Sequence, residues 1–63
     1  MPLWRAQIDF MTPAGGVRQW EGMVEAHTVV EATERAMRDF RTSRPRRELP
    51  EVLDFQLVPV DGG

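Results

Sequence analysis

Hydrophobic and polar residues alternate along the first part of the chain, residues 3–11, and again along residues 17–26. A period of two places successive side chains on opposite faces, which predicts two half-buried β-strands. Residues 12–16 lie between them and contain a proline and two glycines, which favour a turn. The pattern therefore predicts an antiparallel hairpin. The residues predicted to share its apolar face are Trp4, Ala6, Ile8, Phe10, Trp20, Gly22, Val24 and Ala26.

After the second strand the period changes to 3.6 residues, which is typical of an amphipathic helix. Thr28 is followed three residues later by Glu31, the spacing of a capping box, so we predict a helix from Val29 to about Arg41. The residues on its apolar side are Val29, Ala32, Thr33, Ala36, Met37 and Phe40. The i,i+4 ion pairs expected on its polar side are Glu31 with Arg35 and Glu34 with Arg38.

Residues 42–50 are polar, contain two prolines and are predicted to form a loop. Residues 52–60 then alternate again and predict a third strand, which is followed by a short tail at 61–63. Pro59, near the end of this strand, indicates an edge position or a strand terminus. The predicted apolar face carries Leu53, Phe55 and Leu57, and the other face carries Val52, Asp54, Gln56 and Val58.

The order of these elements predicts one α+β domain over residues 1–63, a two-layer ββαβ arrangement. One helix would cover one face of a three-stranded antiparallel sheet. The pattern leaves open whether the third strand lies beside the first or the second. The predicted core consists of Trp4, Ile8, Phe10, Trp20, Val24, Val29, Ala36, Phe40, Leu53, Phe55 and Leu57.

The sheet face turned away from the helix would carry apolar side chains scattered among polar ones. These apolar residues are Leu3, Met11, Val17, Met23, Val52 and Val58. An antiparallel sheet can expose such a mixed face to water. Alternatively, this face or an edge strand pairs with a second copy of the chain, giving a homodimer, or with another protein. Both interpretations stay open at this point.

The composition disfavours several classes of function. The chain has no cysteine, which excludes a disulfide, a thiolate metal site and a cysteine nucleophile. Its single histidine, His27, precedes the predicted helix cap without partners for catalysis or metal binding. We therefore expect neither an enzyme nor a bound metal or other cofactor. The sequence shows no signal-peptide pattern and no apolar run of membrane-spanning length, so we expect a cytoplasmic protein without a membrane partner.

Charge is distributed unevenly along the chain, whose formal net charge is −2. Residues 35–47 contain six arginines and one aspartate, a net of +5. This segment is either an electrostatic site for phosphate or an acidic protein surface, or a solvated loop neutralised by neighbouring acids. The candidate partner-binding residues are Arg38, Arg41, Arg44, Arg46 and Arg47, with Met11 and Met23 adding adaptable apolar area.

Residues 20–32 combine a strand ending in Val24-Glu25-Ala26, a threonine cap and Glu31-Ala32 at the opening of the helix. Together with Ala36 and Phe40, this stretch resembles small ββαβ proteins of bacteriophages and mobile elements, some anti-CRISPR inhibitors among them. The resemblance covers about half of the chain. It implies a protein that works by binding and blocking a larger complex of the host cell, and it assigns no catalytic residue.

The leading hypothesis is therefore a non-enzymatic protein-interaction module of phage or mobile-element origin. It would inhibit or regulate a host complex by binding it through residues 38–47 and the uncovered sheet face. The second hypothesis is a small nucleic-acid-binding regulator that uses residues 38–47, although the negative net charge disfavours it. The third rests on Gly62 and Gly63, because a C-terminal Gly-Gly resembles that of ubiquitin-like sulfur carriers. The third strand is followed at once by the tail, which leaves no residues for the further strands of their β-grasp fold.

Overall fold

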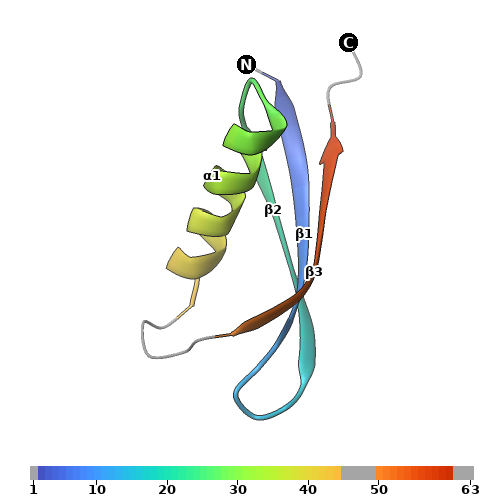
Figure 1. Cartoon of the computed structure of the whole chain (residues 1–63), viewed down its shortest axis with the longest axis vertical. Coiled ribbons are helices and arrows are strands. Elements are labelled where there is room, and N and C mark those ends of the chain that lie inside the picture. Colours follow the sequence, from blue (N-terminus) through green and yellow to red (C-terminus); the bar gives the residue numbers. More distant parts are fainter. Residues whose placement is uncertain (1, 45–49, 61–63) are drawn as a thin grey trace.

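The computed structural model describes residues 2–44 and 50–60. They form strand β1 (Leu3–Met11), strand β2 (Val17–Glu25), helix α1 (Val29–Thr42) and strand β3 (Glu51–Pro59). The strands make one antiparallel sheet in the order β2-β1-β3, and α1 covers one face (Figure 1). The predicted two-layer ββαβ fold is confirmed, and the strand order is now decided. Pro59 is the last residue of an edge strand, as its position indicated.

The turn between β1 and β2 depends on Thr12 and Gly15. The Thr12 amide donates to the Gly16 carbonyl at 2.7 Å, and the Gly15 amide donates to the Thr12 carbonyl at 2.9 Å. Gly15 has a φ of 91°, a left-handed conformation that glycine adopts without strain. The resulting register pairs Met11 with Val17 and places the even-numbered residues of both strands on the helix side.

Helix α1 begins at a capping box, as predicted. The Glu31 amide donates to Thr28 Oγ1 at 3.1 Å, and the His27 amide donates to the Glu31 carboxylate at 2.9 Å. The carboxylate thus reaches one residue before the cap, which ties the segment leaving β2 to the first helical turn. The helix ends one residue later than expected, at Thr42, whose hydroxyl donates to the Arg38 carbonyl at 2.9 Å.

The core between helix and sheet has two parts. The first consists mainly of small side chains: Ala6, Val24, Ala26, Ala32 and Ala36. Trp4 packs against them, and its indole N–H donates to the Ala26 carbonyl at 3.0 Å. The second part consists of Ile8, Phe10 and Phe40. Because alanines line the first part, the helix approaches the sheet closely there, while the larger rings fill the second part.

Aromatic rings meet around Phe40 in the second part of the core. Its ring packs edge-on against Phe10, with centroids 5.0 Å apart, and against Trp20, with centroids 5.8 Å apart. The Trp20 indole also lies directly over Gly22 in the same strand. A Cβ at position 22 would stand 2.5 Å from the indole, so the glycine is what permits this ring position.

The helix packs mainly against β2, so part of β3 stays uncovered on the same face (Figure 1). Nine of the eleven predicted core residues are buried or half-buried. The prediction is wrong for Val29 and Leu53, which are 57% and 47% exposed. Val29 is the first residue of the helix and stands one turn before the buried stripe that begins at Ala32.

Leu53 is exposed because a bulge interrupts β3. Asp9 of β1 pairs with Asp54 but Phe10 pairs with Val52, so Leu53 is the extra residue. The strand is bent, so that the first part of β3 runs in a different direction from its second part (Figure 1). The shift also places Val52 opposite Phe10 on the helix side, which corrects its predicted position on the other face.

Candidate interaction surface

The structure divides the five arginines predicted to bind a partner into three groups. Arg38 and Arg41 are exposed on the second half of α1. Arg44 follows the helix and is half-buried, with its guanidinium carbon 4.7 Å from the centroid of the Phe10 ring. This cation–π contact gives Arg44 a role in the fold itself. Arg46 and Arg47 lie outside the described residues.

The two predicted methionines are on the same sheet face but are far apart. Met23 pairs with Arg5, and Met11 pairs with Val17 at the hairpin turn. Six residues of β1 separate these two levels, which corresponds to about 20 Å along the strand. Met23 is 48% exposed, whereas Met11 is half-buried. The structure therefore does not gather both methionines and the arginines into one surface.

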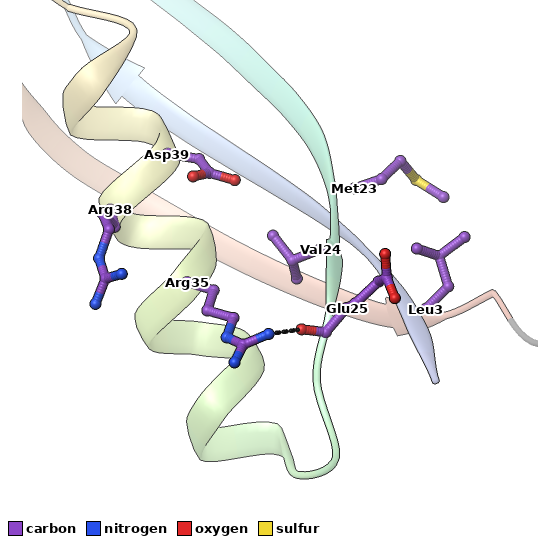
Figure 2. Close-up of a pocket in the computed structure, with 7 residues that line it drawn as sticks. All are labelled: Leu3, Met23, Val24, Glu25, Arg35, Arg38 and Asp39. Atoms are coloured by element: carbon purple, nitrogen blue, oxygen red, sulfur yellow. Dashed lines mark hydrogen bonds between the residues drawn. The ribbon is translucent and has the colours of Figure 1, made fainter. Parts of the chain in front are cut away.

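Met23 and Arg38 both line an open groove of about 560 Å³ along the outer edge of β2, from opposite sides. The groove is lined by Leu3, Met23, Val24, Glu25, Arg35, Arg38 and Asp39 (Figure 2). Val24 faces the helix, and Met23 lies on the opposite face of the same strand. The groove thus runs around the edge of β2, with Leu3, Met23, Val24 and Glu25 on the strand side and only charged residues on the helix side.

Arg35 connects the helix to this edge. Its guanidinium donates to the Glu25 carbonyl at 2.6 Å and stands 3.9 Å from the Glu31 carboxylate (Figure 2). The first contact occupies an outward-facing backbone carbonyl of an edge strand. The second contact confirms the ion pair that the sequence predicts between Glu31 and Arg35. Arg35 is thus engaged in holding α1 against β2.

Arg38 is placed differently from Arg35. Between the residues that the structure describes, the Glu31–Arg35 contact is the single salt bridge, so the predicted Glu34–Arg38 pair is not formed. Arg38 extends along the outer side of α1, where its charge is exposed (Figure 2). Arg38 and Arg41 also line a second hollow on the helix surface. Arg38 thus lines both hollows and Arg41 the second, while Glu25 and Asp39 are the acids in the lining of the groove.

Among the described residues, those that line the groove include no histidine. His27 is exposed, and its backbone amide is the atom that bonds to Glu31. Within residues 2–44 and 50–60, no three histidine or acidic side chains come close enough to hold a metal ion. In the same part of the chain, no helix has the length and apolar character required to cross a membrane.

The chain was compared with models of protein families, with curated proteins and with solved structures, and none of the three comparisons found a match.

Two of the residues that line the groove, Met23 and Arg38, are among the predicted partner-binding residues. Arg38 and Met23 were candidates because of charge and of their predicted position on an uncovered face. Arg35 is the predicted ion-pair partner of Glu31, and neither it nor Glu25 and Asp39 is among the predicted partner-binding residues. Their place in the groove depends on β2 being an edge strand, which no local pattern indicates.

Proposed function

We propose that this chain is a non-enzymatic interaction module that binds an acidic, partly apolar segment of a larger protein in the groove along β2. The observation that carries the proposal is an open groove that is lined by both Met23, which is 48% exposed, and Arg38, which is also exposed. Methionine adapts to different apolar partners, and arginine binds carboxylates through two parallel hydrogen bonds. A segment that alternates acidic and apolar side chains complements both features.

The lining of the groove carries two arginines and two acids, and the support for an acidic partner comes from the exposed arginines on the second half of α1. Arg35 already donates to the backbone carbonyl of Glu25 and pairs with the Glu31 carboxylate, so it contributes little to recognition. Arg38 and Arg41 are three residues apart on one helix and therefore present their guanidinium groups side by side. Positive charge of this kind steers an acidic surface toward the groove before the apolar contacts form.

The resemblance of residues 20–32 to phage and mobile-element proteins supports an inhibitory role on a complex of the host cell. Nucleic acid is the weaker alternative for the same arginines. Binding to single strands relies on aromatic side chains that stack on bases. Among the described residues the large exposed apolar side chains are valines, a leucine and a methionine, and the aromatic rings pack on the helix side of the sheet.

The proposal predicts a specific pattern of retained proteins when the tagged full chain is used as bait in lysate of a host cell. We expect one stoichiometric partner that is retained after nuclease treatment. The double variant Arg38→Glu/Arg41→Glu and the variant Met23→Asp should each lose it. Arg18→Glu is the matched control, because Arg18 is an exposed arginine near the hairpin turn, outside the groove.

Circular dichroism of each variant establishes that the fold is intact before the capture results are compared. Retention of the partner by the Arg38→Glu/Arg41→Glu variant would remove the groove from the interaction. Loss of all retained material after nuclease treatment would favour the nucleic-acid alternative instead.

A further inference from the structure

The outer edge of β3 differs from the outer edge of β2. The Val60 amide donates to the Leu3 carbonyl at 2.9 Å, so the N–H of Val60 faces β1. Because peptide groups alternate in direction along an antiparallel strand, the backbone N–H and C=O groups of Phe55 and Leu57 face away from β1. No side chain of the described residues bonds to these outward groups, whereas Arg35 covers the Glu25 carbonyl at the edge of β2.

Two features limit the regular part of this edge, and they are symmetric about Gln56. On one side, the bulge at Leu53 bends the strand. On the other side, Pro59 has no N–H, and the alternation places its nitrogen on the outward side. Leu53 and Pro59 each lie three residues from Gln56. The backbone groups available for pairing are therefore centred on Gln56.

The side chains along this edge continue the apolar core. Phe55 and Leu57 pack against the core clusters but are only half-buried, and Leu53 is 47% exposed. They are incompletely covered because the helix lies mainly over β2. An additional strand along the outer edge would bring apolar side chains next to Leu53, Phe55 and Leu57. Its backbone would form hydrogen bonds with the outward-facing N–H and C=O groups of β3.

We propose that the additional strand is β3 of a second copy of the chain, paired antiparallel about a two-fold axis at Gln56. In this register Phe55 of each copy exchanges two backbone hydrogen bonds with Leu57 of the other. Gln56 faces Gln56, and their side-chain amides can bond to one another. Asp54 faces Val58, so this carboxylate has no like charge directly opposite it.

A second copy explains features that an unrelated strand would not require. The bulge and Pro59 are equally far from Gln56, which matches a two-fold axis at that residue. In the dimer, Pro59 of each copy then lies opposite the bulge of the other. The described part of β3 carries its acids, Glu51 and Asp54, in the first half, while residues 55–60 carry no charge. Two-fold pairing therefore places the acidic half of one strand beside the uncharged half of the other.

The resulting assembly is closed. Pairing through β3 gives a six-stranded sheet in which both β2 strands are outermost. The contact uses the same surface on both copies, so it is isologous and ends at a dimer. The groove along β2 lies at the outer edges of this sheet and stays accessible. The dimer and the proposed function therefore use different surfaces, and the failure of one proposal does not imply the failure of the other.

Sedimentation equilibrium of the full chain, from micromolar to millimolar concentration, tests the dimer. Gln56 is exposed, so Gln56→Glu and Gln56→Lys should leave the fold intact, as checked by circular dichroism. Each variant alone should dissociate at least about fivefold more readily, because like charges then meet at the axis. An equimolar mixture of the two variants should restore dimerisation, because opposite charges then face each other.

Arg18→Gln is the matched control, since it changes the net charge by the same amount as Gln56→Glu at an exposed residue of β2; it should dimerise like the wild type. A wild-type chain that is monomeric at every concentration would overturn the proposal. A dimer that is unaffected by both Gln56 substitutions, or a mixture that fails to recover, would equally overturn it.

Discussion

The close approach of Trp20 to Gly22 leads to a quantitative prediction for the variant Gly22→Ala. A Cβ at position 22 would lie 2.5 Å from Cη2 and 2.7 Å from Cζ2 of the indole. Ordinary carbon–carbon contacts are about 3.5–4.0 Å, so the ring would have to move by about 1 Å. The indole cannot move without disturbing its edge-on contact with Phe40, whose ring is almost fully buried.

The expected free-energy change combines two opposing effects. Overpacking of this kind costs about 1–3 kcal/mol. Alanine recovers about 0.5–1 kcal/mol, because glycine loses more backbone freedom on folding. The backbone of Gly22 is outside the left-handed region, so the substitution adds no conformational strain. We expect the free energy of unfolding to fall by about 1–2 kcal/mol.

Urea unfolding followed by circular dichroism at one fixed protein concentration measures this change. A double-mutant cycle with Trp20→Leu isolates its cause. When the indole is absent, Gly22→Ala should be neutral or slightly stabilising, which corresponds to a coupling energy of about 1 kcal/mol or more. If Gly22→Ala has the same effect with and without the Trp20 indole, the space needed by the ring is not the reason why a glycine is required at position 22.

Two further predictions concern the helix and its C-terminal end. Thr28→Ala removes the side-chain acceptor for the Glu31 amide and should lower the free energy of unfolding by about 1 kcal/mol, whereas Thr28→Gly should lower it by only a few tenths, as measured by urea unfolding. Arg44→Ala removes the contact with the Phe10 ring and should lower the free energy of unfolding by at least about 0.5 kcal/mol. Arg41→Ala is the control, because Arg41 is exposed on the helix; equal effects at both positions would contradict a structural role for Arg44.

The candidate surface was predictable only in part, and Arg38 and Arg44 illustrate why. Both were grouped as partner-binding residues because they are close in a basic segment of the chain. The structure exposes Arg38 beside the β2 groove and places Arg44 over the Phe10 ring. Phe10 is more than thirty residues away in the sequence, so no local pattern could indicate this contact. The groove residues Glu25 and Asp39 were missed for the same reason.

Local sequence patterns determined the hairpin, the helix with its cap, the third strand and most of the core. These features follow from interactions between residues within one or two turns or along one strand, such as Thr28 with Glu31. The tertiary structure decided the strand order, the bulge at Leu53 and the identity of the two edge strands. These depend on pairing and packing between segments far apart in the chain. The β2 groove and the outward edge of β3 therefore exist only in the folded molecule.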